Sequence, residues 1–593
     1  MRLKLLVTIC ALLAACVAAP AATAQSRTAA TLREEIRVLV DRTAAQWARM
    51  MTPAGDFANP FPADLARGHG SFVPPMLAYS LHRAGQRNGD PVLVAAAERA
   101  WPRAVDPIRA SAFDMVGAGY AYRLLTLSDA RRAQLADYMS RYGIPLNGYR
   151  CLIVPTCWSN LRLVDALAVI GITGAGIRAA DPAARMANPV AARAGAVHIV
   201  NRWARRVVDH GVRGRIGGER IRGSLLSDPG LDTTAYHALS TFMITQAIEQ
   251  LGPEASHAAR RFRRELYDTL AALVAPDGDM TYLGRGQGQT WIPGIVAGAM
   301  ATGAREAAAR DPRRAARYLA VAQRALDRLE RLHASPAGLR LVPGKRTTAA
   351  GIDGYAHTVA YNGLALFGLT AALDALEEIP GVPVGRLPAD GRLRVADSAR
   401  SGLGVVSDGR VWLAVHRKPM AVSDLRWDFG ALALKVRTAR GWKDLLAPRP
   451  FTVLAPNTTG PALMHRGRLS LPRGYGITVS AREIDVNGGG YKLGARWLTH
   501  ARFLWTLTRR GARMTVTGVR AGDRFRLLAY TPAGTGRLGR RTLRAAGARW
   551  RFDRPIQGRR IRGYHSGPVE QLDALEARLS APKSGRFVVT IER

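Results

Sequence analysis

The chain has 593 residues, of which 48% are hydrophobic and 22% are charged. This is the composition of a globular protein with a sizeable core, and it excludes a disordered, collagen-like or coiled-coil chain. Lys and Arg number 85 against 45 Asp and Glu, a net charge of +40. After residue 25 no apolar run is long enough to span a bilayer, so the pattern excludes a polytopic membrane protein.

The positive charge favours a polyanionic partner, because clustered cations attract anions over long distances. The arginines are nevertheless scattered along the chain, so a solvated basic surface without a partner explains the same composition. No helix-turn-helix, RNP or zinc-finger pattern accompanies the charge, which argues against nucleic acid. The partner that the sequence favours is therefore an acidic polysaccharide.

The N-terminus has the layout of an export signal. Arg2 and Lys4 precede an apolar stretch, Leu5–Ala15, and Ala22-Thr23-Ala24 offers a cleavage site. This pattern predicts a secretory signal peptide over residues 1–25 and a secreted or cell-surface protein.

The four cysteines lead to two further predictions. Leu13-Ala14-Ala15-Cys16 resembles a lipobox, in which Cys16 carries a lipid anchor. In the body of an exported protein, the closely spaced pair Cys151 and Cys157 predicts a local disulfide. No additional metal ligands lie near this pair, and we expect neither a metal site nor a cofactor.

Residues 26–380 carry apolar side chains at the helical spacing i, i+3, i+4, i+7. About eleven or twelve helices fit this part of the chain. Turn signals such as Asp90-Pro91 and Asp311-Pro312 separate them. The clearest helical stretches are Ala29–Met51, Val92–Trp101, Ala192–Val208, Thr233–Leu251, Ala258–Leu273, Arg314–Leu332 and Asp353–Leu376.

Residues 385–593 carry short, often alternating apolar runs, which indicate antiparallel strands. A Pro/Gly-rich connector near residue 380 separates the two patterns. The runs are Val411–Val415, Ala431–Val436, Gly476–Val479, Phe503–Leu507, Met514–Val519, Phe525–Ala529 and Phe587–Ile591. We therefore predict a multidomain α+β chain: an α/α toroid, an incomplete barrel of helical hairpins, over residues 26–380, followed by an antiparallel β-sandwich over residues 385–593.

Four segments place polar and aromatic residues at helix starts or in loops, which in a toroid line the mouth of the central cavity. The first contains Trp158, Ser159 and Asn160. Ser159 is a candidate helix cap, and Asn160 shares a helix face with Leu163 and Leu167. The amide of Asn160 is a candidate to bind a substrate carboxylate, and Trp158 to bind substrate. The alternative for Asn160 is a capping or loop-bonding role.

The second segment, residues 227–237, ends in Tyr236 and His237. Asp232 is a candidate N-cap, which places both side chains early in a helix. Adjacent helical residues point about 100° apart, so they need not face one site. Both are candidate proton donors or acceptors, and His237 has the alternative of a core histidine satisfied by a backbone group.

The third segment, residues 277–291, contains Arg285 between glycines that permit close approach of a ligand. A polar, Gly-rich stretch of this kind is typical of a sugar-binding lip, with an aromatic ring as a stacking platform. The alternative is a long connecting loop. The candidate substrate-binding residues here are Tyr282, Gln287, Gln289 and Trp291.

The fourth segment, residues 351–362, has His357 and Tyr361 at i and i+4, and therefore on one helix face. Continued by the small residues Ala365 and Gly368, they form a candidate cavity wall. The candidate substrate-binding residues here are Tyr355, Tyr361 and Asn362. The alternative is an aromatic stripe in the core.

The order Asn160, Tyr236 with His237, Arg285 and His357 resembles that of the toroid-plus-sandwich polysaccharide lyases, the heparinase II/III-like and chondroitin or alginate lyase superfamily. As architecture the resemblance covers most of the mature chain. It implies β-elimination at a uronate, with Asn160 and Arg285 neutralising the carboxylate. It also implies that a Tyr or His takes the C5 proton, that Tyr236 protonates the leaving oxygen and that His357 orients or neutralises. The roles of Tyr236, His237 and His357 are interchangeable at this point.

Two other functions remain open. A glycoside hydrolase on the same toroid would use two carboxylates about 5 to 9 Å apart, and the candidates are Asp228, Asp232, Asp277, Asp279 and Asp353. A non-catalytic exported protein would bind a polyanion in a basic groove without turnover. Elimination is distinguishable because it creates a double bond that absorbs ultraviolet light.

Overall fold

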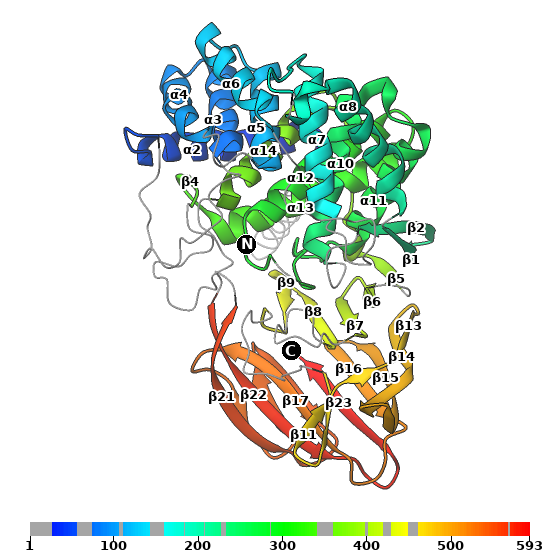
Figure 1. Cartoon of the computed structure of the whole chain (residues 1–593). Helices are drawn as coiled ribbons and strands as arrows, with labels where there is room; N and C mark the ends of the chain where they lie inside the picture. The colour runs from blue at the N-terminus through cyan, green and yellow to red at the C-terminus, as the bar shows by residue number, and fades with distance from the viewer. Residues whose placement is uncertain are drawn as a thin grey trace, which may run out of the picture.

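In the computed structural model, helices fill the N-terminal part of the chain and antiparallel sheets fill the C-terminal part (Figure 1). Among the described residues, no helix combines the length and the apolar character needed to cross a membrane. Cys16, Cys151 and Cys157 lie outside these residues, so the lipid anchor and the disulfide stay predictions. The structure describes residues 27–55, 74–105, 111–142, 159–182, 184–206, 208–226, 233–284, 286–340, 360–397, 401–418, 429–448, 460–566 and 570–593.

The helical part has the hairpin-rich architecture that the apolar spacing predicts. Asp90 caps α4 by accepting from the backbone N–H groups of Val92 and Leu93, and Asp311 caps α13 in the same way. A proline follows each cap, and proline suits the first helical position because it has no N–H to leave unpaired. The main helices are α2 (Ala29–Met50), α3 (Pro74–Asn88), α4 (Pro91–Ala104), α5 (Ala112–Leu124), α6 (Asp129–Ser140), α7 (Ser159–Gly174), α8 (Pro189–His198), α10 (Thr234–Leu251), α11 (His257–Leu273), α12 (Trp291–Ala308), α13 (Pro312–His333) and α14 (Ala360–Glu377).

Helices α10, α12 and α14 run side by side in the same direction. Gly298 of α12 lies between Phe242 of α10 and Gly368 of α14, and a Cβ atom there would lie 2.6 Å from the Gly368 carbonyl oxygen. Two turns earlier, Trp291 of α12 contacts Tyr236 of α10. Because these contacts advance together along the helices, the N-terminal ends of the helices lie at one end of the ring.

Aromatic rings fill the middle of this ring of helices. Tyr79, Tyr120 and Phe242 each contact Phe367 edge to face, with centroids 4.9 to 5.9 Å apart. All four side chains are buried, and the Tyr120 hydroxyl donates to Gln246 at 2.5 Å. The interior of the ring is therefore packed around these side chains.

The helical part also contains a β-hairpin that the sequence pattern did not predict. The helical stretch expected to reach Val208 ends at Arg206 with the short α9 (Ala204–Arg206), and β1 (Val208–Ile216) and β2 (Glu219–Leu226) follow. The physical reason is the change of period: polar and apolar residues alternate along β1 and β2, and Gly217 adopts a positive φ of 58° in the turn. Such a conformation favours glycine and ends a helix.

Three larger antiparallel sheets follow, and the hairpin belongs to the first of them. The seven-stranded sheet has the order β2-β1-β5-β6-β7-β8-β9. Its remaining strands are β5 (Arg392–Asp397), β6 (Leu403–Asp408), β7 (Val411–His416), β8 (Gly430–Thr438) and β9 (Gly441–Asp444). The nine-stranded sheet contains β12 (Pro472–Arg473), β13 (Gly476–Val479), β14 (Glu483–Leu493), β15 (Arg496–Thr508), β16 (Gly511–Thr517), β18 (Arg537–Leu538), β19 (Thr542–Ala545), β20 (Ala548–Phe552) and β23 (Arg586–Glu592). The five-stranded sheet contains β10 (Ala462–His465), β11 (Arg468–Ser470), β17 (Arg524–Pro532), β21 (Gln557–Ser566) and β22 (Glu570–Ser580).

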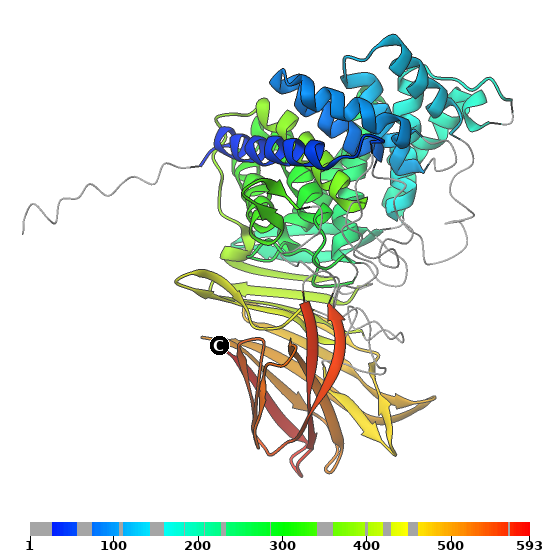
Figure 2. The ribbon, with the colours of Figure 1, turned by 90° about the vertical axis from the view of Figure 1, so that its left-hand side faces the viewer.

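The seven-stranded sheet lies between the helices and the other sheets (Figure 2). Along β7, Trp412 and Ala414 belong to the core shared with the helices, whereas Val411 and Leu413 belong to the core of the sandwich. Since successive strand residues point to opposite faces, β7 is buried on both sides. The sandwich and the ring of helices are thus continuous through this sheet.

A buried charge cluster joins the loop before α12 to the sheet. Lys435 of β8 donates from Nζ to Asp277 at 2.9 Å and to Asp444 at 2.5 Å. Arg328 of α13 contacts Asp277 at 3.0 Å and Asp279 at 3.3 Å. Burial raises the pKa of Asp277, but the charges of Lys435 and Arg328 outweigh it and bring that pKa well below its usual value. We call these five residues the interdomain cluster.

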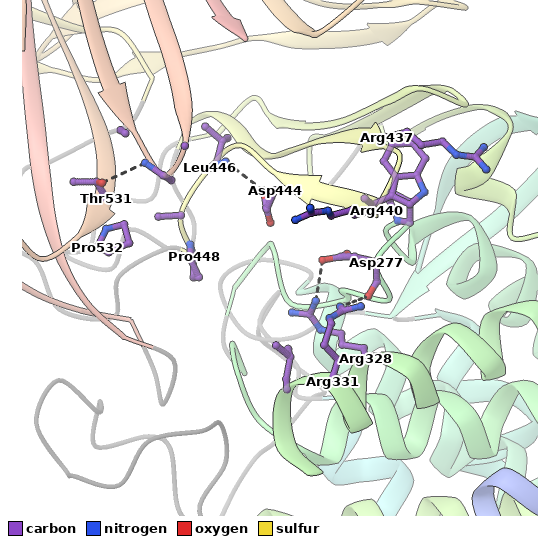
Figure 3. A pocket seen from close by; sticks show the side chains of 18 of the residues that line it. Asp277, Arg328, Arg331, Arg437, Arg440, Asp444, Leu446, Pro448, Thr531 and Pro532 are labelled. Carbon is purple, nitrogen blue, oxygen red and sulfur yellow. Dashed lines mark hydrogen bonds and ion pairs between the residues drawn. The ribbon is translucent and has the colours of Figure 1, made fainter. Parts of the chain in front are cut away.

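A cavity of about 1070 Å³ opens beside the interdomain cluster. Figure 3 shows Asp277 and Arg328 on its helical side facing Arg440 and Asp444 on its sheet side. Its innermost charges pair with one another, as expected for a structural joint between two parts of a chain.

Candidate functional site

The candidate site lies at the N-terminal ends of α10 and α12, where two of the predicted segments meet. Thr233 caps α10 by accepting from the Tyr236 backbone N–H at 3.2 Å. Thr234 donates from its hydroxyl to the Met280 carbonyl oxygen at 2.7 Å. The Gly-rich segment before α12 is therefore tied to the first turn of α10.

Glycine lets this segment pass close to α12. Gly286 has a φ of 100°, and a Cβ atom on it would lie 2.7 Å from the Ile292 side chain. The indole of Trp291 donates to the side-chain oxygen of Gln289, and both side chains are buried. Gln287 is also buried, and its side-chain oxygen has no partner within the described ranges. The predicted sugar-binding lip is thus folded inward against the helix start.

Tyr236 lies at the edge of this packed segment. Its ring meets that of Trp291 edge to face, with centroids 5.7 Å apart and planes at 71°. Tyr236 remains partly exposed, whereas Trp291 exposes 1% of its surface. The buried indole therefore holds a tyrosine that solvent or a ligand can reach.

Asn160 lies at the start of α7, which packs against α10 in the same direction. Gly171, near the end of α7, approaches Gln250 near the end of α10. Asn160 precedes Gly171 by eleven residues in α7, and Leu239 precedes Gln250 by eleven residues in α10. Leu239 is about one helical turn from Tyr236. The helix geometry therefore brings Asn160 and Tyr236 to the same end of two adjacent helices.

Polar atoms at the start of α7 are buried without partners. Asn160 exposes 5% of its surface and Ser159 none. The Asn160 Oδ1 and the Ser159 Oγ have no hydrogen-bond partner among the residues that the structure describes. Buried polar atoms in folded proteins are almost always satisfied, so this pair is a candidate place for a ligand or water to complete the bonding.

His237 points away from this end, into the packing beside β2. The Leu226 backbone N–H donates to its Nδ1 at 3.2 Å, and the side chain is fully buried. Burial lowers the pKa of His237 to about 3, against a smaller opposing effect of the Leu266 backbone. The imidazole is therefore neutral at ordinary pH. Its Nδ1 bond to a backbone group fits the core-histidine alternative, and its Nε2 has no partner among the described residues.

Two predicted substrate-binding residues are engaged in internal contacts. The Tyr282 hydroxyl donates to the last carbonyl of α11 at 2.8 Å, and its ring packs on Trp412 at 5.2 Å. The amide of Asn362 accepts from the Thr290 hydroxyl and donates to the Arg340 carbonyl at 3.2 Å. In this structure Tyr282 connects the helices to the sheet, and Asn362 connects α12 to α14.

The remaining predicted residues have no described placement. The side chain of Tyr361 lies outside the described residues, although α14 includes its backbone. The roles predicted for them stay predictions. Within the described ranges, no group of three or more His, Cys, Asp or Glu side chains is arranged to hold a metal ion. The residues outside the description are Trp158, Arg285, Tyr355 and His357.

The sequence reasoning missed the interdomain cluster. Lys435 occupies a buried position in the alternating strand predicted over Ala431–Val436. A lysine in an otherwise apolar strand requires buried carboxylates as partners, and this signal was available in the sequence. Its actual partners, Asp277 and Asp444, were not predictable, since one of them is 158 residues away.

No protein-family model matches the chain, and no curated protein matches it. Among solved structures, the chain is similar to the Streptomyces coelicolor chondroitin AC lyase in complex with chondroitin sulphate, at 15% sequence identity and a TM-score of 0.50. That likeness covers 97% of this chain and 80% of the lyase. A heparinase III matches at 10% identity and a TM-score of 0.42, covering 93% and 84% of the two chains. An α-1,6-mannanase of a Salegentibacter species matches at 12% identity and a TM-score of 0.37, covering 58% and 99%.

The chain thus has the toroid-plus-sandwich fold seen in the chondroitin AC lyase, and the predicted fold class is confirmed. The ring of helices followed by antiparallel sheets is the architecture that the sequence resemblance implied. The division at residue 380 stays a prediction, and the β1–β2 hairpin crosses it by pairing with β5.

Proposed function

We propose that this chain is an exported polysaccharide lyase that cleaves a uronate-containing acidic polysaccharide by β-elimination. The observation that carries the proposal is the placement of Asn160 and Tyr236 in the first turns of two helices that pack against each other. One is a buried amide with an unpartnered atom, and the other is a partly exposed phenol supported by Trp291. The toroid-plus-sandwich fold supports this proposal as architecture.

Asn160 is suited to bind the substrate carboxylate. A helix N-terminus carries partial positive charge and favours an anion, and Asn160 is the second residue of α7. Rotation of the amide presents either its oxygen or its NH₂ group, so it can donate a hydrogen bond to a carboxylate. That bond strengthens as negative charge develops on the carboxylate during proton abstraction.

Tyr236 is suited to act as the acid-base group. As phenolate it takes the C5 proton, a double bond forms between C4 and C5, and the C4–O bond breaks. The phenol then returns that proton to the departing glycosidic oxygen, so that atoms and charge balance. The partial positive charge at the start of α10 favours the phenolate that the first step needs. Arg285, between Gly284 and Gly286, completes the neutralisation of the carboxylate in this proposal.

Of the carboxylates predicted for a hydrolase, Asp277 and Asp279 are described, and they give that function less support. Asp277 and Asp279 contact Arg328, and Asp277 also pairs with Lys435. A hydrolase needs one carboxyl group that stays protonated, and this requires a raised pKa. The pKa of Asp277 is shifted in the opposite direction, because the cationic charges outweigh its burial.

The test is ultraviolet absorbance of the unsaturated uronate, with purified mature protein and a panel of alginate, hyaluronan, chondroitin, heparan and glucuronan. We expect absorbance to rise on at least one polymer. New reducing ends without absorbance would replace the lyase with a hydrolase. Neither signal, together with retained binding of a polymer, would replace it with a non-catalytic binding protein.

A further inference from the structure

Arginine side chains cover one face of the β1–β2 hairpin and the adjoining strand β5. Arg213 stands opposite Arg222, and Arg215 stands opposite both Arg220 and Arg394. Directly paired residues and residues two apart on a strand share one face of a sheet. These five side chains, joined by Arg392 two residues from Arg394, therefore project from the same face.

The opposite face of these strands fixes the direction in which the arginines project. Val212, Ile221 and Leu393 are buried in the core shared with the helices. The Ser224 backbone N–H donates to Thr269 of α11 at 3.0 Å. The arginines consequently face away from the helices and from the candidate active site.

This alignment of like charges opposes folding unless an anion neutralises it. Like charges directly opposite one another on neighbouring strands are destabilising. Nearby Glu219 pairs with Arg314 and Arg317, and Asp408 pairs with Arg482. Among the described residues, no ion pair reaches the six arginines of the hairpin and β5. Their charge is therefore available to an external partner.

The arginines line a continuous groove. One cavity of about 990 Å³ and another of about 510 Å³ share Arg215 and Arg394. The far wall consists of β13, where Ile477 and Val479 lie. Together the two cavities are lined by nine arginines and one carboxylate, Asp408. The arginines are Arg213, Arg215, Arg220, Arg222, Arg392, Arg394, Arg410, Arg482 and Arg509.

We propose that this arginine groove is a second, non-catalytic binding site for an acidic polysaccharide chain. Guanidinium groups bind carboxylates and sulfates through paired hydrogen bonds, and a row of them suits a polymer with regularly spaced anions. Among the described residues that line the groove there is no Phe, Tyr or Trp. Single-stranded nucleic acids typically bind on aromatic stacking platforms, so this lining favours a polysaccharide. The assignment of the ligand as an acidic polysaccharide rests on the proposed function. The arginine groove is argued from strand pairing and cavity lining, which do not depend on that function.

Binding at this groove would keep a polymer attached between cleavage events. A chain held at one site reaches a second site on the same molecule at a high effective concentration. The groove and the helix starts lie on different sides of the seven-stranded sheet, so a long polymer is required to reach both. We therefore expect the groove to matter for long polymers.

The experiment uses the full mature chain and fluorescently labelled chondroitin sulfate, with affinity measured over a series of salt concentrations. The test variant combines Arg213→Gln, Arg222→Gln and Arg394→Gln. The matched control combines Arg468→Gln, Arg496→Gln and Arg513→Gln, three exposed arginines on other sheets. The two variants lose the same formal charge, so a general charge effect weakens both equally.

We expect the groove variant to bind about tenfold more weakly or worse, with the slope of log affinity against log salt reduced by about two to three. The control should change much less. The groove variant should also melt at a higher temperature than the parent without ligand, because it relieves the like-charge pairs. This second readout distinguishes loss of a binding site from misfolding.

An equal loss of affinity in both variants would reject the proposal that the groove is a binding site. Tighter binding of a double-stranded DNA oligonucleotide at the same salt concentration would overturn its assignment to a polysaccharide. Both results are independent of turnover when all the proteins carry Tyr236→Phe, the substitution expected to suppress product formation. Absence of elimination products would reject the proposed lyase while leaving the groove result intact.

Discussion

The interdomain cluster and the start of α7 both contain polar groups removed from solvent, but in opposite states. Lys435, Asp277 and Arg328 have oppositely charged neighbours within 3.0 Å. Asn160 and Ser159 are buried with side-chain oxygens that lack partners in the described part of the chain. Burial alone therefore does not indicate a site. The satisfied cluster stabilises the joint, whereas the unsatisfied groups are positioned for a ligand.

The substitution Tyr236→Phe should have the largest effect on activity. It removes the hydroxyl proposed to carry the proton but keeps the ring that packs on Trp291. We expect the rate of elimination to fall by about 10² to 10⁴-fold, with little change in melting temperature. Tyr122→Phe is the matched control, since Tyr122 is a partly buried tyrosine of α5. Full elimination activity in Tyr236→Phe would reject the proposed role.

The substitution Lys435→Met should have the largest effect on stability. It leaves the partly buried carboxylates of Asp277 and Asp444 beside each other without their shared cation, although Asp277 keeps its contact with Arg328. Losing the shared cation of partly buried carboxylates should cost about 1 to 3 kcal/mol, between the values for exposed and fully buried pairs, which calorimetry would detect as a lower melting temperature. Combining Lys435→Met with Asp444→Asn should recover part of the loss. An unchanged melting temperature in the single variant would show that the cluster is not a joint.

The pair Asn160→Ala and Asn362→Ala sharpens the comparison between unsatisfied and satisfied amides. Asn160→Ala should lower kcat/KM by about 10² to 10³-fold, as loss of a transition-state hydrogen bond does, and leave stability nearly unchanged. Asn362→Ala should lower stability by about 1 to 3 kcal/mol, because it leaves the buried Thr290 hydroxyl unpaired. Kinetics and thermal unfolding of both variants test this. A loss of stability in Asn160→Ala together with a loss of activity in Asn362→Ala would reverse the interpretation of the two sites.

Stability should fall as the solution becomes acidic. The pKa of His237 is lowered to about 3 by burial, and the same cause lowers that of His333 to about 3. Since both folded values lie below the unfolded value near 6.5, the stabilisation is present above pH 6.5 and is lost as the pH falls toward 3. Each histidine contributes a slope of up to about 1.4 kcal/mol per pH unit.

The measurement is the free energy of unfolding in denaturant between pH 7.5 and pH 4. The variant His237→Gln should show a shallower dependence on pH than the parent, because glutamine does not titrate. Equal slopes in the two proteins would show that His237 is charged or exposed in the folded state.

The architecture was predictable because its signals are local. The spacing of apolar residues indicated the helices, short apolar runs indicated strands such as β7 and β8, and Asp-Pro pairs marked the starts of α4 and α13. The β1–β2 hairpin escaped prediction because its glycines and alternating arginines lie within a helical context. Its pairing with β5, more than 160 residues later, has no local signal at all.

The sequence by itself determined the composition of the two parts, the residue types available for chemistry and the candidate order Asn160, Tyr236, Arg285 and His357. Only the tertiary structure determined where the side chains of adjacent residues lie. Tyr236 and His237 follow one another in one helix, yet one reaches the open helix end and the other is buried against β2. The physical reason is that successive helical residues point about 100° apart, and the neighbouring elements determine which direction is the interior.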